Sequence, residues 1–291
     1  MSPPKVFYPS ALVPPTGPPI TQVEQIPLAP GFEDISVIPG GGVFPGFTGS
    51  SRSEPSFQVS TSQIKTVLDL CVQDSIAVGG QSANFDIEYQ RGQNLQTRFP
   101  SSSDEHTRLR VTDWLFAWDS INAPENGLAE ISTMLKPISD GTNPPVVRQS
   151  GVPLSAAPAV QHVYGVGPVF LNGEPICVES WSWQNNLTYK TKVCSGLAYL
   201  GYASVQTSSP IATIQTEDRD AVLSYLPSGS GQTLLEFYLR RKSQGGLNEP
   251  NVSPVHIRLA ALLGTVKPDS DSALKVQVHS FTTDTAAAIP S

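Results

Sequence analysis

The sequence predicts a mainly β protein with two tandem β-sandwich or β-barrel modules, each with a short flanking α-helix, and with an extended N-terminal arm. Three observations predict this fold. Prolines gather at the start of the chain, short runs of alternating apolar and polar residues follow them, and one succession of elements occurs twice. The expected parts are an arm at 1–54, a first module at 55–139, an inter-repeat β segment at 140–207 and a second module at 208–291.

Composition sets the limits within which this fold is expected. The 291 residues are 39% hydrophobic and 15% charged, with a formal net charge of −7. This length can bury the core of one large or two small domains. We expect no contact with a membrane, because no run of about 18 apolar residues occurs. The negative charge argues against a protein that grips nucleic acid through its phosphates, because that function needs clustered Lys and Arg.

The arm is predicted from proline, since 12 of the 27 prolines fall within residues 1–55. Proline lacks a backbone donor and biases the preceding residue toward extended geometry. A disordered tail is one interpretation. The arm also contains aromatic residues that could lie on a neighbouring subunit, so we expect a chain without residues 1–50 to fold but fail to assemble. These candidate assembly residues are Phe7, Tyr8, Phe32, Phe44 and Phe47.

The first module begins with a strand and a short helix. Ser60 and Gln63 have the spacing of a capping box, and the apolar residues that follow recur at i, i+3, i+4 and i+7 from Ile64 to Cys71. Apolar and polar residues then alternate from Phe85 to Gln90, as in a half-buried strand. Further strands are expected at residues 107–118 and 128–135.

The second module is predicted from an internal duplication. Pro55–Thr61 matches Pro210–Thr216 at an offset of 155 residues (210 − 55 = 155). The His-x-Arg-Leu run at His106 recurs at His256, at an offset of 150 (256 − 106 = 150). Because the matched parts keep their order, we interpret them as two copies of one β-rich module. The segment 140–207 would supply strands of its own.

The chemistry of an enzyme is missing from these patterns. No Gly-x-Ser-x-Gly nucleophile elbow and no phosphate-binding loop occurs, the four histidines lack metal-ligand spacing, and the three cysteines lack a C-x-x-C pair. We therefore expect no catalytic site, no cofactor and no metal. Trp114 with Trp118, and Trp181 with Trp183, each share one sheet face, where core packing is favoured over stacking on sugars. A glycan-binding module stays open as an alternative.

The residues that remain resemble those of a virion protein. The succession Tyr164–Gly173, Val178–Asn186 and Ser209–Asp218 resembles the strand, outward loop and Pro-β-β-Asp order of phage major tail and tail-tube proteins. The similarity covers roughly residues 55–285. It implies a β-module with one flanking helix that assembles into stacked rings, and family members with tandem modules form trimeric rings of pseudo-sixfold symmetry.

The expected function is therefore that of a structural virion protein, assembled in the host cytoplasm, which forms a tail tube with copies of itself and contacts other virion proteins. DNA would pass through the lumen without specific binding, because acidic residues there would repel phosphate. The candidate lumen-facing residues are Asp86, Glu88 and Glu236, on matching strands of the two repeats. A capsid decoration, minor capsid or neck protein would use the same modules without a lumen and is the nearest alternative.

Overall fold

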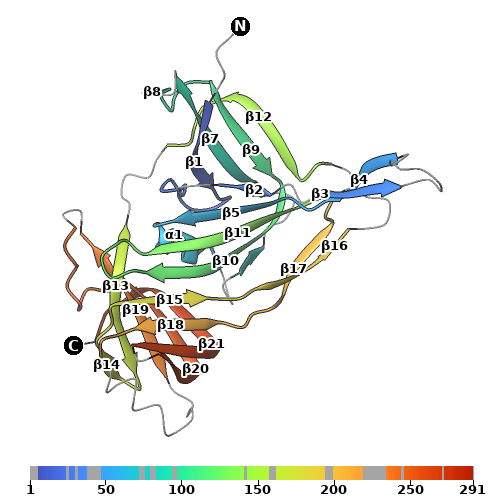
Figure 1. Ribbon diagram of the computed structural model, residues 1–291. Helices are drawn as coiled ribbons and strands as arrows, with labels where there is room; N and C mark the ends of the chain where they lie inside the picture. Colours follow the sequence, from blue (N-terminus) through green and yellow to red (C-terminus); the bar gives the residue numbers. More distant parts are fainter. Residues whose placement is uncertain are drawn as a thin grey trace.

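The computed structural model in Figure 1 contains several antiparallel sheets and one short α-helix in the part of the chain that it describes. It is mainly β, as the sequence predicts. The described residues are 6–23, 26–29, 32–37, 47–71, 76–78, 83–93, 97–140, 143–156, 162–193, 199–218, 234–243, 246–270 and 272–290.

The elements follow one another along the chain as short strands, with the helix near the start. In the first half they are β1 (Val6–Val13), β2 (Leu28–Ala29), β3 (Phe32–Val37), β4 (Phe47–Ser53), β5 (Ser56–Thr61), α1 (Ile64–Leu70), β6 (Ile76–Val78), β7 (Phe85–Gln93), β8 (Thr97–Arg98), β9 (His106–Val111), β10 (Asp113–Ala123), β11 (Glu130–Ile138) and β12 (Val146–Val152). In the second half they are β13 (Val163–Leu171), β14 (Glu174–Ile176), β15 (Ser180–Gln184), β16 (Thr188–Lys192), β17 (Tyr202–Thr207), β18 (Ile211–Gln215), β19 (Leu235–Lys242), β20 (His256–Ser270) and β21 (Ala273–Ala287).

One large sheet runs through both halves. Its order is β14-β13-β19-β20-β21-β18-β15-β10-β11-β5-β2, with β6 against β10. A smaller sheet, β1-β7-β9-β12 with β8 against β7, lies at the end of the molecule opposite β20 and β21 (Figure 1). Two hairpins, β3–β4 and β16–β17, form separate two-stranded sheets.

The core is continuous because alternate residues of these strands point to one face. In β11, for example, every second residue is buried. Large aromatic rings meet edge to face where the halves join, with Trp183 between Phe237 and Phe281, at centroid distances of 5.5 and 5.0 Å. A single cluster of buried apolar residues extends from Leu12 to Val278, so the two halves share one core.

The helix α1 is where the sequence predicts it, but its start differs from the expected capping box. Gln63 makes no side-chain capping bond, and its backbone N–H donates instead to Thr61 Oγ1 at 3.1 Å. The freed Gln63 Oε1 accepts from the Thr21 N–H at 2.6 Å and ties residues 20–22 to the helix. The second predicted helix falls mostly on residues 219–233, outside the described residues.

The first strand changes the interpretation of residues 1–54. β1 pairs with β7, with Leu12 opposite Ile87, and Leu12 and Ile20 are fully buried. Val6–Val13 is therefore a strand of the fold, and Phe7 and Tyr8 are half-buried in it. We now expect a chain without residues 1–50 to lose folding as well as assembly, contrary to the expectation from the sequence. Phe32 lies on β3 and Phe47 on β4, and Phe44 lies outside the described residues.

The pairing of β7 with β9 recurs in β19 with β20. Phe85 faces Val111 and Tyr89 faces Thr107 in the first half, whereas Leu235 faces Ala261 and Leu239 faces Ile257 in the second. All four positions are shifted by 150 residues. Each further neighbour recurs too. β1 pairs with β7 as β13 pairs with β19, with an irregularity at the same register position.

The remaining pairings recur in the same way. β5 lies against β11, with Phe57 opposite Leu135, as β18 lies against β21, with Ala212 opposite Val276. The long β20 spans the positions of β9 and β10 together, and the long β21 spans those of β11 and β12. Segment 140–207 is thus divided: β12 pairs with β9 of the first half, whereas β13 pairs with β19 of the second.

Candidate assembly surfaces

The two halves join edge to edge. β10 pairs with β15, placing Ile121 opposite Trp183 and Ala123 opposite Trp181. Asn185 is fully buried at this seam. Its side chain donates to the Trp118 carbonyl and accepts from the Trp183 indole, both at 2.9 Å, so its amide is satisfied and the seam is fixed in one register. The four tryptophans are all buried, as core packing requires, and none offers a free ring to a sugar.

The β16–β17 hairpin of the second half covers a face of the first half. Leu115 of β10 packs against Leu200 and Ala203, and Lys136 Nζ lies 4.9 Å from the centre of the Tyr189 ring. The Ser139 N–H donates to the Leu200 carbonyl at 2.7 Å. Burial raises the pKa of Tyr189 to about 12, and the charge of Asp119 acts in the same direction. This contact is largely apolar and desolvated.

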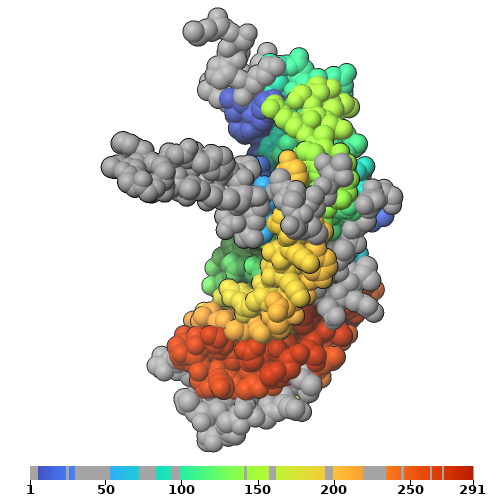
Figure 2. Space-filling model, turned by 90° about the vertical axis from the view of Figure 1, so that its right-hand side faces the viewer, coloured from blue at the N-terminus to red at the C-terminus, as the bar shows by residue number. Residues whose placement is uncertain are grey.

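A groove lies on the corresponding face of β20 and β21, and the C-terminal residues form a broad exposed area in Figure 2. Its volume is about 410 Å³. Thr265 faces Gln277 and Lys267 faces Lys275 across the hairpin, so these side chains share one face. Both lysines and His279 are exposed. The groove is lined by Thr265, Lys267, Pro268, Asp269, Lys275, Gln277 and His279.

Sequence reasoning missed this groove. Its signal is the polar residue at every second position of 265–269 and 275–279, a pattern that predicts one polar face on two paired strands. The pattern does not tell whether that face meets solvent or another protein surface. Only the comparison with the covered face of β10 and β11 makes it a candidate site.

The predicted acidic residues lie in ion pairs. Asp86 accepts two bonds of 2.9 Å from Arg110, and Glu236 accepts one of 3.0 Å from Arg258. Glu88 is fully buried, bonded to Arg108 at 2.8 Å and to the N–H of Ser155 at 2.8 Å. A buried, neutralised carboxylate cannot present charge to a channel, so the interpretation of Glu88 as a lumen residue is wrong. That Asp86 and Glu236 face a lumen stays a prediction.

The two histidines at matching positions make the same bonds. His106 Nδ1 accepts from the Arg91 N–H at 3.0 Å, and His256 Nδ1 accepts from the Arg241 N–H at 3.1 Å. The opposite ring nitrogen lies 2.8 Å from the Pro100 carbonyl and, in the second half, 3.0 Å from the equivalent carbonyl. Both rings are buried, so they act as internal supports for the preceding loop.

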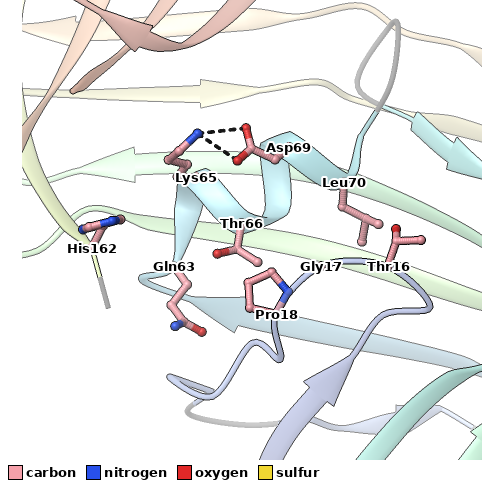
Figure 3. A pocket seen from close by; sticks show the side chains of 9 residues that line it. All are labelled: Thr16, Gly17, Pro18, Gln63, Lys65, Thr66, Asp69, Leu70 and His162. Carbon is pink, nitrogen blue, oxygen red and sulfur yellow. Dashed lines mark hydrogen bonds and ion pairs between the residues drawn. The ribbon is translucent and has the colours of Figure 1, made fainter. Parts of the chain in front are cut away.

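A cavity of about 420 Å³ lies between α1 and the turn at residues 16–18 (Figure 3). Lys65 pairs with Asp69 at 2.8 Å, and both side chains bond to Thr285 of β21. Burial lowers the pKa of His162 at the rim, with smaller contributions from the charges of Arg241 and Lys65. Because Lys65 and Asp69 neutralise each other, this arrangement joins helix to strand.

Other chemical sites are not supported by the described residues. Among them no three His, Cys, Asp or Glu side chains are placed to hold a metal ion. Burial raises the pKa of Cys71 to about 12, so its thiol stays protonated at neutral pH, whereas Cys177 is exposed. No helix in the described ranges has both the length and the apolar character needed to cross a membrane.

Comparison with known proteins gives no family: no protein-family model matches the chain, and no curated protein matches it. The geometry of the surfaces therefore carries the functional argument alone.

Proposed function

We propose that the chain is a self-assembling structural protein, a subunit of a phage tail tube, built from two copies of one β-module. The modules are residues 6–154 and 163–289. The main strand pairings of the first half recur in the second half, and this recurrence supports the proposal. A backbone hydrogen bond near the end of each module recurs as well. The Leu154 N–H donates to the Ser101 carbonyl at 3.0 Å, and the Ile289 N–H donates to the Asn251 carbonyl at 2.8 Å.

The observation that carries the proposal is the way the two modules join. The second module gives an edge strand, β15, and a hairpin, β16–β17, to the first. A repeated module has these surfaces twice. In each chain, therefore, the hairpin side of the first module and the groove side of the second module have no counterpart within the chain. Open strand edges in soluble proteins are otherwise covered or blunted, because their unpaired N–H and C=O groups recruit other strands. Copies of the same chain can satisfy both surfaces.

A heterologous contact of this kind closes into a ring or continues as a helical filament. Stacked rings would form a tube, and a net charge of −7 per chain would let a lumen repel the phosphates of passing DNA. We also infer the tandem β-sandwich or β-barrel architecture from the same recurrence. A capsid decoration, minor capsid or neck protein is the second candidate, because it would use the same modules without a lumen.

Electron microscopy of the purified full-length chain in negative stain tests the proposal. We expect hollow tubes or rings with a continuous central channel. Discrete monomers or compact trimers without a channel would contradict the tail-tube proposal and favour the decoration or neck protein. Binding of oligosaccharides, followed by tryptophan fluorescence, would favour the glycan-binding alternative.

A further inference from the structure

We infer that the β3–β4 hairpin of one chain lies in the β20–β21 groove of a second copy. The inference deepens the proposed self-assembly and rests on it. One side of the contact is the β3–β4 hairpin, and the other is the groove between β20 and β21 that is lined by Lys267 and Lys275.

The first step is that β3–β4 and β16–β17 are equivalent hairpins. Asp34 pairs with Ser50, and 155 residues later Tyr189 pairs with Val205. A register irregularity precedes both pairs at the same position. The strands at the base of the hairpins keep this offset, since Leu28 faces Phe57 as Trp183 faces Ala212. What β16–β17 does for the first module, β3–β4 can do for a second module.

The second step is that the groove is equivalent to the face that β16–β17 covers. Leu115 and Lys136 are opposite each other on that face, and Thr265 and Gln277 occupy their register positions in the groove. Likewise, the pair of Ala117 and Met134 in the first half occupies the same register position as the pair of Lys267 and Lys275 in the second. The face is covered in the first module and open in the second.

The third step is that both partners are available. In the part of the chain described, β3 and β4 form a sheet of their own, and the one further bridge of these strands joins Ser53, at the base of the hairpin, to Tyr199. Lys267 and Lys275 form no ion pair with any described side chain. Among the described residues, no further strand pairs with the hairpin beyond Ser53, and no ion pair occupies the two lysines of the groove.

The fourth step is charge. The covered face inside the chain is largely apolar, with Leu115 against Ala203 and Val205, and its lysine, Lys136, lies over the Tyr189 ring. Of the described residues that line the groove, Lys267, Lys275 and His279 are basic and Asp269 is acidic. The sequence of β3 has Glu33 and Asp34 side by side. Opposite charges at the rim of a contact steer association and suppress wrong partners, so this pairing favours a second copy of this chain over an unrelated apolar ligand.

The consequence is a head-to-tail assembly. Each chain uses its first module to give a hairpin and its second module to receive one, so the same contact repeats from chain to chain. The internal contact is permanent because it is largely apolar and because both of its sides belong to the same polypeptide. The contact between chains is polar and weakens as salt screens it.

Charge reversal in the full-length chain tests the contact. The hairpin variant is Glu33→Lys with Asp34→Lys, and the groove variant is Lys267→Glu with Lys275→Glu. Sedimentation velocity over a concentration series measures association at low salt. We expect each variant alone to need about tenfold more protein than the wild type for half-association, a change of about 1.4 kcal/mol.

An equal mixture of the two variants is the decisive measurement. The lysines of the hairpin variant meet the glutamates of the groove variant, and the wild-type hairpin of one meets the wild-type groove of the other. The mixture should therefore associate nearly as well as the wild type. A variant that has merely lost its fold could not be rescued in this way.

The matched control reverses two exposed acidic residues elsewhere, Glu125→Lys in a turn with Glu174→Lys at the start of β14, for the same change in net charge as in the hairpin variant. It should associate as the wild type does. The inference is overturned if either reversed variant associates like the wild type, or if the mixture is no better than its components. Restored association without hollow tubes in the microscope would overturn the tail tube and leave this contact standing.

Discussion

At the scale of single residues, two buried imidazoles show how the same sequence run produces the same local structure twice. In each copy Nδ1 accepts a backbone N–H, so Nε2 carries the proton and donates to a proline carbonyl. The ring thereby links the backbone N–H of a strand residue, Arg91 in β7 or Arg241 in β19, to the proline carbonyl of the loop before the histidine. His106 and His256 are recognisable from sequence because they precede the same x-Arg-Leu strand.

We predict that His106→Ala and His256→Ala each lower the free energy of unfolding by about 2–3 kcal/mol, because each removes a fully buried ring together with its two hydrogen bonds to the backbone. His279→Ala is the control, since that side chain is exposed and its loss should stay within about 0.5 kcal/mol. Urea unfolding followed by circular dichroism measures all three. Near-equal stability of the wild type and either buried variant would contradict the role given to these rings.

Glu88 shows where prediction from residues stops. Alternation along 85–90 correctly indicates a strand with its charged side chains on one face. It cannot indicate that arginines of the next strand and residues 153–155 cover that face. In the second module Tyr238 occupies the same position and packs with Phe170, Ala287 and Ile289. One covered position thus accommodates an ion pair in one copy and an aromatic cluster in the other.

At the scale of elements, β1 explains why a proline-rich start need not be an arm. Proline removes a ladder donor, but the pairing of β1 with β7 is irregular between Pro9 and Ala11. A bulge leaves a residue outside the ladder and tolerates proline there. β13 has its irregularity between Val166 and Val169, a stretch that contains Gly167 and Pro168. Composition detects the prolines but not their register, so the sequence assigns to an arm two strands, β1 and β2, that belong to the two main sheets.

We predict that Gly167→Ala destabilises β13 by about 2–3 kcal/mol, because a Cβ there would lie 2.4 Å from the Tyr238 carbonyl oxygen. Gly173→Ala is the matched comparison. Gly173 has a φ of +88° with open space around it, so only the left-handed backbone opposes the methyl group, at a cost of about 1 kcal/mol. Thermal unfolding compares the two. A larger loss at Gly173 than at Gly167 would count against the close approach of β13 and β19.

At the scale of the whole molecule, the duplication could be seen in the sequence but its boundaries could not. The matches are clearest in β5, β7 and β9, where buried and capping residues constrain the sequence. β1 and β13 share a register and little sequence, because a strand at this position needs only apolar side chains on one face. In the proposed two-module division, the first module would begin near residue 6 and include β12, because β1 and β12 both belong to the sheet of β7 and β9.

We predict that the two modules do not fold independently. A fragment of residues 1–158 would expose Leu115 and the edge of β10, and a fragment of residues 159–291 would expose Trp181 and Trp183 of β15. Each alone should be insoluble or aggregated, whereas co-expression should yield a stable one-to-one complex on size-exclusion chromatography. Cooperative unfolding of either fragment as a monomer would refute this.

The different lengths of β10 and β20 bear on how an assembly would come apart. Ser120 of β10 corresponds to Ser270, where β20 ends, and β10 runs on to Ala123 to meet β15. In the proposed assembly, a join between neighbouring chains would form without those last residues and would have fewer backbone bonds. Any closed ring would therefore alternate firm and weak joins, and under mechanical load or denaturant it should fracture at the weak ones, releasing intact polypeptides before any of them unfolds.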